Sequence, residues 1–174
     1  MTIQEAIDLI RHNHITSLTK TVWADLGCGS GIFTHALANL LNDDSLIYAV
    51  DKNISAFKKR PFSKSVIMNP VELNFETSTL PFNNLDGILM ANSLHFVKDK
   101  KSFLEKIKKS LNDNGFFLLV EYDTDISNYW VPYPVSFLSL KQIFDDAGYS
   151  SVTKINERPS RFNKANLYAA IITK

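Results

Sequence analysis

The 174-residue sequence contains little cysteine, no long apolar run and no marked excess of either charge. Its one cysteine, Cys28, excludes an intrachain disulfide and a cysteine metal cage, which fits a reducing compartment. No apolar run approaches the roughly 20 residues that a membrane-spanning helix needs. The stretch from Met1 to His14 carries acids instead of a signal-peptide core. We therefore expect a cytoplasmic protein that does not cross a membrane.

The balance of charge excludes further classes of function. The chain has 19 Lys and Arg residues and 18 Asp and Glu residues, a formal charge of +1. A dedicated nucleic-acid-binding protein usually carries a basic excess, so we interpret the basic clusters at 58–60 and 98–109 as solvated surface. The histidines show no metal-ligand spacing. We expect a small-molecule substrate, no metal and no nucleic-acid partner, and the oligomeric state stays open.

Alternating helical and extended patterns run along the chain without a repeat, a linker or a domain boundary, so residues 1–174 are predicted to form one domain. Strands alternating with helices predict an α/β fold with a doubly wound, mostly parallel sheet and helices on both faces. The last two strands have no helix between them, which predicts one antiparallel strand near the C-terminus. Apolar runs place the strands at 22–26, 46–50, within 65–75 where Pro70 interrupts, and at 85–90, 116–121, 152–155 and 167–172. The last two are joined by a loop that contains residues 158–161.

Capping signals and apolar stripes predict the limits of the helices. The spacing indicates helices over 3–10, 33–41, 53–60, 103–111 and 140–147. Capping boxes at Thr2-x-x-Glu5 and Ser139-x-x-Gln142 are predicted to open the first and the last, and Asp99 to cap the fourth. Asn114-Gly115 and Gly148 are the predicted stops of the last two helices.

Three of the six glycines lie within Gly27-Cys28-Gly29-Ser30-Gly31, between a buried strand and a helix. Glycines at such a point allow a tight turn and let a ligand lie against the main chain. The alternative, a turn without a ligand, needs only one or two glycines, so we favour ligand binding. In a doubly wound sheet, ligands bind beyond the carboxyl ends of the strands, which is where this loop would lie.

Spacing and charge around this loop indicate the class of ligand. The dinucleotide fingerprint G-x-G-x-x-G would need its third glycine at Ile32. Asp25 would repel a pyrophosphate but bind an ammonium group. S-adenosylmethionine carries an α-amino group and a sulfonium and has no phosphate, so this charge favours it over NAD. Asp51, at the end of the second strand, is placed to bind a ribose, which both ligands contain.

Residues 25–31, Asp-Leu-Gly-Cys-Gly-Ser-Gly, resemble the first motif of the class I S-adenosylmethionine-dependent methyltransferases. Asp51, Leu80-Pro81-Phe82, the run 85–95 and Asn112-Asp113-Asn114-Gly115 then follow in the order of that family. The likeness extends from about Val22 to Glu121 and through the closing strand pair. It implies a small, single-domain, Rossmann-like fold with a seven-stranded sheet, and direct methyl transfer from S-adenosylmethionine.

The resemblance also implies which residues hold the cofactor. They are Asp25 at the methionine amino group, Gly27, Cys28, Gly29 and Gly31 along the loop, Asp51 and Lys52 at the ribose, Asn74 and Phe75 at the adenine, and Asn92 and Ser93 at the methionine end. The family usually places an acidic residue at the adenine. The side-chain oxygen of Asn74 can accept the same hydrogen bond, but it carries no negative charge. Asn92 is not in an Asn-Pro-Pro-Tyr setting, which argues against enzymes that methylate flipped DNA bases.

Substrate contacts are expected at the carboxyl ends of the fourth and fifth strands. His95 is one candidate general base, and the alternative is a histidine packed beside the pocket. Glu121, Tyr122 and Asp123 follow the fifth strand as candidate substrate contacts. Asp123 is the better candidate base of the two acids because it lies further outside the strand. The alternative for each acid is a solvated loop or cap residue.

The segment 129–137 contains four aromatic residues and two prolines without helical or strand periodicity. We interpret it as a wall of the acceptor pocket, with Trp130 and Tyr133 as contacts. The alternative is a loop whose aromatic side chains fill the core. Ser160 and Arg161 are candidates to reach the same cleft.

Two other functions stay open at this point. An NAD-dependent oxidoreductase would share the ribose-binding acid but lacks the third glycine in register. A non-catalytic cofactor-binding scaffold, or a partner subunit of another methyltransferase, is compatible with a short chain that adds little around the core. The acceptor atom (oxygen, nitrogen, sulfur or carbon) stays open too.

Overall fold

The protein is described by a computed structural model that covers residues 1–16, 19–60, 64–160 and 165–174. Its strands form one seven-stranded sheet in the order β3-β2-β1-β4-β5-β7-β6. They are β1 (Val22–Leu26), β2 (Leu46–Asp51), β3 (Ile67–Glu72), β4 (Leu85–Ala91), β5 (Leu111–Tyr122), β6 (Ser151–Pro159) and β7 (Asn166–Thr173). The helices are α1 (Ile3–Ile10), α2 (Ile32–Leu40), α3 (Lys100–Ile107) and α4 (Phe137–Asp146), with the 3-10 turns η1 (Ile54–Ala56), η2 (Leu94–Phe96) and η3 (Lys108–Ser110). Each predicted strand is therefore present.

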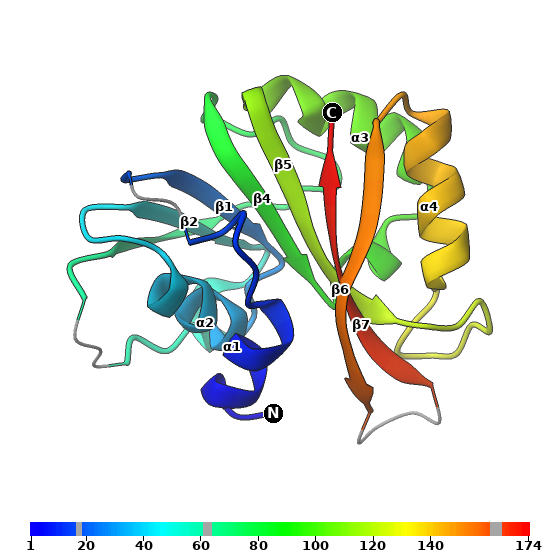
Figure 1. The fold of residues 1–174 in the computed structure, drawn as a ribbon, viewed down its shortest axis with the longest axis horizontal. Coiled ribbons are helices and arrows are strands. Elements are labelled where there is room, and N and C mark those ends of the chain that lie inside the picture. Colours follow the sequence, from blue (N-terminus) through cyan, green and yellow to red (C-terminus); the bar gives the residue numbers. More distant parts are fainter. Residues whose placement is uncertain (17–18, 61–63, 161–164) are drawn as a thin grey trace.

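The sheet is mostly parallel. β1 lies between β2 and β4 and runs parallel to both, and the pairs β2–β3 and β4–β5 are parallel as well. β7 runs antiparallel to its two neighbours, β5 and β6. The direct connection from β6 reverses the chain because no helix intervenes. The predicted fold class is confirmed: an α/β fold with one reversed strand near the C-terminus and helices on both faces (Figure 1).

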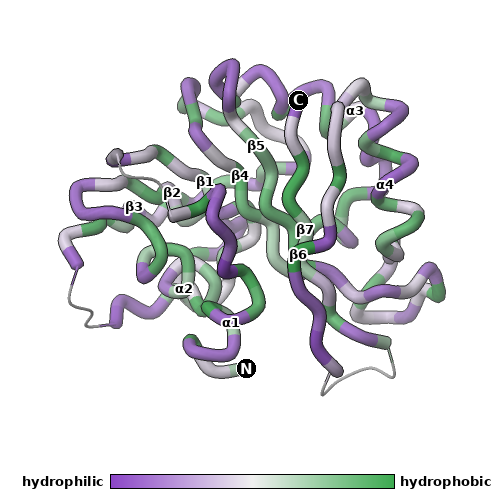
Figure 2. Tube along the Cα trace, viewed as in Figure 1, coloured by the Kyte–Doolittle hydropathy of each residue, from purple (hydrophilic) through white to green (hydrophobic). Residues whose placement is uncertain are grey.

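Alternate side chains of the central strands fill two separate cores. Trp23 and Leu118 belong to the core on the face that α1 and α2 cover. Ala24 and Phe117, their neighbours in sequence, belong to the core on the other face, beside α3 and α4 (Figure 1). Hydrophobic residues accordingly concentrate on β4, β5 and β7 in Figure 2. Burial on both faces is the reason why these strands are nearly continuous apolar runs.

Two of the predicted helix caps are confirmed. Thr2 and Glu5 form a capping box on α1: the Thr2 hydroxyl accepts the Glu5 N–H at 3.1 Å, and the Glu5 carboxylate accepts the Thr2 N–H at 2.7 Å. Asp99 caps α3 by accepting the Ser102 N–H at 3.1 Å. These local signals depend on residues three positions apart, so a local pattern identifies them.

The capping box predicted at Ser139 and Gln142 is wrong. Ser136 is the N-cap of α4, and its hydroxyl accepts the Ser139 N–H at 3.2 Å. Asp125 fixes this start by accepting both the Ser136 N–H and the Ser136 hydroxyl proton. That contact joins residues well apart in the chain, so a capping pattern does not contain it. Gly148 follows the end of α4 with a φ of +77°, as a helix stop requires.

Two helical predictions are wrong in extent. The stretch 53–60 forms only the 3-10 turn η1, capped by the Asn53 side chain, instead of a helix. The helix predicted to run to Leu111 and stop at Asn114-Gly115 ends at Ile107 and continues as η3. Leu111 already belongs to β5 and pairs with Leu85 of β4. The Leu111 side chain would enter the core from a helix as well as from a strand, so the apolar spacing does not distinguish the two kinds of element here.

Strand limits also differ from the prediction at two places. Pro70 lies inside β3, which pairs with β2 alone. An edge strand tolerates a residue without an N–H group, so the proline does not interrupt it. β6 is longer than predicted and includes Arg158 and Pro159, which the sequence pattern places in a loop. This extension carries Arg158 towards the carboxyl ends of the central strands, where the candidate site lies.

Candidate active site

The glycine loop, residues 27–31, leaves β1 and turns back over the end of β2. The N–H groups of Gly27 and Cys28 both donate to the carbonyl oxygen of Val50, at 2.8 and 3.0 Å. Gly27 has a φ of +85°, and a β-carbon added to it would lie 2.4 Å from Cβ of Ser93. The turn therefore requires glycine on both conformational and steric grounds.

The other two glycines of the loop meet different surroundings. Gly31 has a φ of +82°, and an added β-carbon would lie 2.8 Å from Cε2 of Phe57. Gly29 has a φ of +50°, and an added β-carbon would have no neighbour within 4 Å. The main chain at Gly29 therefore borders open space, while Gly27 is closed in by Ser93, which follows β4, and Gly31 by Phe57, which follows η1.

Asp25, the predicted partner of an ammonium group, is buried beneath the loop. Its Oδ2 accepts the Thr34 hydroxyl proton at 2.5 Å, and its Oδ1 has no hydrogen-bond partner among the described residues. Burial raises the pKa of Asp25 to about 7, against the lowering effect of the Thr34 bond and with a smaller rise from the Asp51 charge. A buried carboxylate with a free oxygen favours a cationic donor beside it.

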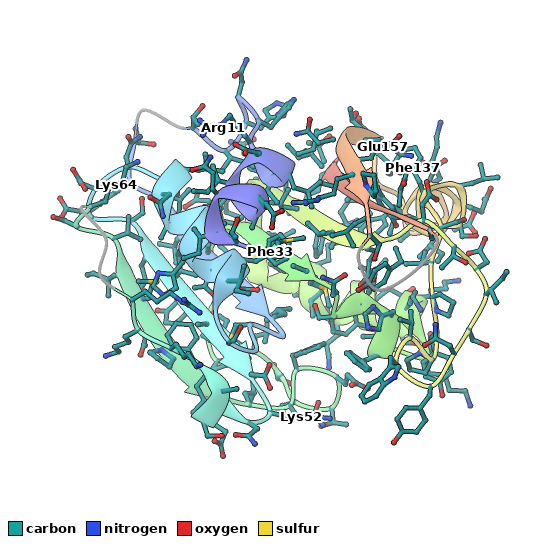
Figure 3. All side chains as sticks on the ribbon, turned by 90° about the horizontal axis from the view of Figure 1, so that it is seen from below. Arg11, Phe33, Lys52, Lys64, Phe137 and Glu157 are labelled. Carbon is teal, nitrogen blue, oxygen red and sulfur yellow. The ribbon has the colours of Figure 1, made fainter. Side chains whose placement is uncertain are left out.

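Asp51 lies at the end of β2 and holds the loop from that side. Its Oδ2 accepts the Gly29 N–H at 2.9 Å, and its Oδ1 accepts the Asn53 N–H at 3.0 Å. A carboxylate offers about four lone-pair sites, so acceptor capacity is left over for ribose hydroxyls. Lys52 is exposed, and in Figure 3 it lies at the rim of the molecule.

A cavity of about 360 Å³ opens beside the loop, at the carboxyl ends of β1, β4 and β5. Five of its lining residues were predicted: Gly27, Cys28, Gly29, Asn92 and Tyr122. Ser160, which the sequence places within reach of the cleft, lines it as well. The remaining lining residues are Met1, Glu5, Ser30, Ile32, Phe33, Ala91, Arg158, Pro159 and Leu167. Sequence reasoning missed Met1, Glu5, Arg158, Pro159 and Leu167 because α1, β6 and β7 approach the loop only in the folded chain. It missed Ser30, Ile32, Phe33 and Ala91 although they lie in or beside the predicted loop and the fourth strand.

Phe33 is one of the cavity residues that the sequence pattern does not single out. It falls on the apolar stripe that predicts the helix 33–41, like the core residues of that helix. It is only partly buried, packs at the edge of the core beneath α1, and lines the cavity. Figure 3 shows it near the middle of the molecule, beside α1. Its position in the first helical turn after the glycine loop is the sequence signal that indicates a cavity residue.

Asn92 and Ser93 follow β4 and have different surroundings. Asn92 has a φ of +54° and lines the cavity, and its buried Oδ1 has no hydrogen-bond partner among the described residues. Its strained backbone is held by an N–H bond to the Val120 carbonyl at 2.8 Å. Ser93 is buried and donates to the Leu26 carbonyl at 2.6 Å. Asn92 thus offers a free acceptor to a ligand, whereas Ser93 braces the glycine loop.

Asn74 and Phe75, the residues predicted at an adenine, lie outside the cavity lining. The exposed Asn74 side chain accepts the Glu76 N–H at 3.0 Å. Phe75 is buried, packs against Phe103, and has Cε1 3.5 Å from the position of an added Gly27 β-carbon. Phe75 therefore supports the loop from the core side.

His95 and Glu121 are brought together at the ends of β4 and β5, and both are buried. The His95 ring nitrogen Nδ1 lies 2.7 Å from Glu121 Oε2, and the His95 backbone N–H donates to Oε1 at 3.2 Å. Neither residue lines the cavity, but the Tyr122 ring, which does, lies 6.3 Å from the His95 ring. Burial and the Glu121 charge raise the pKa of Tyr122.

Asp123, the other candidate base, is bonded on both oxygens and does not line the cavity. Oδ1 accepts the Phe137 N–H at 2.8 Å, and Oδ2 accepts from Lys154 Nζ at 3.0 Å. These bonds connect the end of β5 to the start of α4 and to β6. The arrangement favours the alternative to a catalytic base, which is a loop or cap residue.

The aromatic segment 129–137 buries Val131 and Val135 and exposes three of its four aromatic side chains. The exposed fractions of Tyr129 and Trp130 are 89% and 77%, and their rings pack edge to face. The Tyr133 N–H donates to the His95 carbonyl at 3.0 Å, so the middle of the segment is bonded to the main chain of His95. Of its aromatic side chains, Phe137 packs against the core and against Tyr168, whereas Tyr129, Trp130 and Tyr133 are exposed. Neither Trp130 nor Tyr133 lines the cavity. Arg161 lies outside the described residues.

The first helix closes the cavity from a side that the sequence analysis did not consider. Arg158 of β6 donates to Glu5 of α1 at 2.8 Å, and both side chains line the cavity. Asn156 Nδ2 donates to the carbonyl oxygen of Leu9 at 3.0 Å and to those of Asp8 and Arg11 at the end of α1. α1 is thus tied to β6 at its acidic first turn and at its last turn.

Comparison with known proteins identifies the family. The sequence model of a family described as a methyltransferase domain matches residues 24–117, more than half of the chain. The chain belongs to the methyltransferase domain family. This membership confirms the resemblance stated for the motifs between Val22 and Glu121, and it decides against the NAD-dependent oxidoreductase. No curated protein matches the sequence.

Solved methyltransferase structures share the fold of this methyltransferase. An S-adenosylmethionine-dependent methyltransferase from Aquifex aeolicus is 16% identical. The match covers 99% of this chain and 100% of the Aquifex chain, with a TM-score of 0.62. An S-adenosylmethionine-dependent methyltransferase from Leishmania major is 22% identical. The match covers 97% of this chain and 72% of the Leishmania chain, with a TM-score of 0.70. Burkholderia thailandensis 1,6-didemethyltoxoflavin-N1-methyltransferase, solved with 1,6-didemethyltoxoflavin and S-adenosylhomocysteine bound, is 17% identical over 99% and 77% of the two chains, with a TM-score of 0.68. At these identities the likeness establishes the fold.

Proposed function

We propose that this methyltransferase transfers the methyl group of S-adenosylmethionine to a small-molecule acceptor. The observation that carries the proposal is the buried Asp25 carboxylate, whose Oδ1 has no partner among the described residues, beneath a main-chain loop with two sterically required glycines. A carboxylate here repels phosphate and attracts an ammonium or sulfonium group. The residues present therefore fit a phosphate-free, cationic adenosyl ligand.

The proposed contacts follow the resemblance and the geometry together. Asp25 and Asn92 offer free buried oxygens at the methionine end, the main chain at Cys28 and Gly29 borders the ligand, and Asp51 with Lys52 receives the ribose. Asn74 and Phe75 remain the proposed adenine contacts, and Ser93 supports the glycine loop through its bond to Leu26. When bound, S-adenosylmethionine supplies an activated methyl group, and the chain supplies alignment and exclusion of water.

The size and chemistry of the cavity support a small acceptor. A volume of about 360 Å³ is at the lower end of the range for ligand sites, and the methionine half of the cofactor must share it. Ile32, Phe33 and Leu167 provide apolar walls, and Tyr122 and Arg158 provide polar groups. The related Burkholderia enzyme is named for methylation of a small molecule, 1,6-didemethyltoxoflavin, at N1.

Of the two candidate bases, the contacts support His95 over Asp123. One ring nitrogen of His95 has no hydrogen-bond partner among the described residues, whereas both oxygens of Asp123 are engaged by Phe137 and Lys154. Trp130 and Tyr133 remain proposed acceptor contacts, since the Tyr133 N–H bonds the segment to the His95 carbonyl. The change Trp130→Ala should raise the KM of the acceptor, with cofactor affinity and Tm unchanged because the side chain is exposed.

The decisive experiment measures binding and turnover with the isolated chain. Calorimetry with S-adenosylhomocysteine should give binding, whereas NADH should give none. Incubation with methyl-labelled S-adenosylmethionine and a metabolite extract should then label a small molecule that mass spectrometry identifies. A folded protein that ignores S-adenosylhomocysteine at millimolar concentration would contradict the proposal. Binding without turnover would favour the non-catalytic scaffold or partner subunit.

We also propose that the protein works in the cytoplasm without a nucleic-acid partner. The support is compositional: a single cysteine, which is buried, and a net charge of +1. Among the helices of the described residues, none has the length and apolarity to span a bilayer. Cell fractionation tests the location, and a gel-shift assay with mixed RNA and DNA tests the partner.

A further inference from the structure

The pair formed by His95 and Glu121 has a specific hydrogen-bond pattern. Both side chains are almost fully buried, with exposed fractions of 4% and 1%. The two carboxylate oxygens of Glu121 are divided between the backbone N–H of His95 and its ring nitrogen Nδ1. One residue thus supplies both donors to one carboxylate. This geometry sets the backbone position and the ring orientation of His95 at once.

The pattern also determines where the imidazole proton lies. An ionised carboxylate only accepts hydrogen bonds, so Nδ1 must carry a proton to meet Glu121 at 2.7 Å. In the neutral ring the other nitrogen, Nε2, then holds a lone pair. Among the described residues, no side chain or main-chain group bonds Nε2. A buried histidine with a defined tautomer and a free acceptor nitrogen is suited to receive a proton.

Three titratable groups from neighbouring elements face Glu121: Lys100, Tyr122 and Tyr168. Lys100, which begins α3, feels the Glu121 charge, which partly opposes the lowering of its pKa by burial. Burial, with the Glu121 charge as a smaller cause, raises the pKa of Tyr168 on β7 and of Tyr122 on β5. Both tyrosines therefore stay neutral near pH 7. Phe96 and the Tyr133 main chain complete the surroundings of the ring.

We propose that Glu121 is a positioning residue that holds His95 with Nε2 as the proton acceptor, and that the methyl acceptor is therefore a protic group such as a hydroxyl or a heteroaromatic N–H. The inference rests on the proposed function. It replaces the predicted role of Glu121 as a substrate contact, because His95 engages both oxygens of the carboxylate.

The step balances without a further reactant. Transfer breaks the bond between sulfur and the methyl carbon, and the electron pair of that bond returns to sulfur. A lone pair of the acceptor oxygen or nitrogen forms the new bond to carbon. The acceptor proton passes to Nε2 of His95, and Glu121 stabilises the resulting imidazolium through Nδ1–H. An acceptor without a proton, such as a thioether or a tertiary amine, would need no such base and would leave a fixed cation as product.

The first test observes the tautomer, not the activity. Histidine labelled with ¹⁵N in the full chain, with S-adenosylhomocysteine present, should show one ring in the Nδ1–H form, and the change His95→Asn should remove that signal. In Glu121→Gln the amide oxygen must accept the backbone N–H, so the amide NH₂ faces Nδ1 and the proton should move to Nε2. A His95 ring that carries its proton on Nε2 in the unaltered protein would overturn the proposal, whatever the variants do.

The second test separates positioning from folding. Glu121→Gln and His95→Asn should each lower kcat by roughly 10²–10⁴-fold, the usual share of acid–base catalysis, with the cofactor KM nearly unchanged. Glu105→Gln, the same substitution on the exposed side of α3, is the matched control and should leave kcat unchanged. Full activity of Glu121→Gln, or a product that is a fixed cation, would overturn the proposal. Calorimetry with S-adenosylhomocysteine distinguishes this failure from failure of the proposed function, because neither variant should affect that binding.

Discussion

Single atoms distinguish this site from an ordinary turn between a strand and a helix. The Oδ1 atoms of Asp25 and Asn92 are buried without hydrogen-bond partners among the described residues, and both residues flank the glycine loop. Buried polar atoms are nearly always bonded, so two such oxygens at one loop need an explanation. A ligand with an ammonium group would satisfy them. Residue-scale predictions therefore concern the loop and the carboxylate beneath it.

Gly27→Ala should damage both stability and cofactor binding. The β-carbon would need to lie 2.4 Å from Cβ of Ser93 at a φ of +85°, so the loop has to move. We expect a loss of about 2 kcal/mol or more in the free energy of unfolding and no measurable binding of S-adenosylhomocysteine. Gly148→Ala is the control, since Gly148 has a φ of +77° but no neighbour within 4 Å and lies far from the site. It should lose only about 1 kcal/mol and bind normally.

Asp25→Asn should separate stability from binding through pH. The Asp25 pKa is raised to about 7 from 3.8, so between about pH 4 and pH 7 the folded state binds a proton that the unfolded state has lost. This group therefore lowers the stability of the ligand-free protein as the pH rises through that window. Asp25→Asn removes the ionisable carboxyl group and therefore removes this loss of stability.

The expected outcome for Asp25→Asn is a ligand-free Tm above that of the unaltered protein at pH 8 and close to it at pH 4. Affinity for S-adenosylhomocysteine should fall roughly 10- to 100-fold at pH 8, since a bond to a charged acceptor is lost. Thermal unfolding and calorimetry at the two pH values measure both effects. A Tm that falls equally at pH 4 and pH 8 would contradict the pKa assignment.

At the scale of elements, the notable feature is how α1 is attached. Its apolar face packs on α2, and its two ends are tied to β6 through Glu5–Arg158 and through Asn156. Because Glu5 and Met1 line the cavity, the position of α1 shapes the acceptor side of the site. Core packing holds the apolar face of α1 on α2, and the side-chain bonds to β6 fix its two ends beside the cavity.

Asn156→Ala should loosen α1 and, through it, the site. The side chain donates to main-chain carbonyls at the end of the helix, so its loss should cost about 1–2 kcal/mol. Hydrogen exchange should speed up across residues 3–10, and S-adenosylhomocysteine should bind more weakly. Gln4→Ala, which removes an exposed bond to Asp8 within the same helix, is the control and should change neither. Unchanged exchange in Asn156→Ala would show that apolar packing alone places the helix.

Element limits also show what local sequence can predict. The caps at Thr2 and Asp99 were predicted correctly because each bonds to a residue three positions away. The start of α4 was predicted wrongly because Asp125, across a loop, selects Ser136 as its cap. The end of α3 was predicted wrongly because β4 recruits Leu111 into the sheet. Local sequence therefore predicts the limits of an element only where no residue distant in the chain bonds to the same positions.

At the scale of the whole molecule, the strand order creates the site. The chain enters at β1, continues outward to β2 and β3, and returns to β4 on the other side of β1. The loops after β1, β2 and β4 consequently meet above one strand, where the connections diverge. A bound ligand would join both halves of the sheet and stabilise the folded state.

Ligand binding should therefore raise the stability of the entire domain. S-adenosylhomocysteine at 100 times its Kd should increase the free energy of unfolding by about 2.7 kcal/mol. Thermal unfolding should remain a single transition with a higher Tm, and NADH at the same concentration should leave the Tm unchanged. Two separate transitions, with only one shifted by the ligand, would show that the site does not span the sheet.

The sequence by itself determined the alternation of strands and helices, the reversed final strand, the glycine turn and the two acids at the ends of β1 and β2. These features depend on periodicity, glycine geometry and charge, which act between close neighbours. Only the tertiary structure decided that Glu121 bonds His95, that Asp123 is held by Lys154, and that α1 and Arg158 close the cavity. Each of these contacts joins residues from different elements, and the strand order, not the local sequence, brings them within bonding distance.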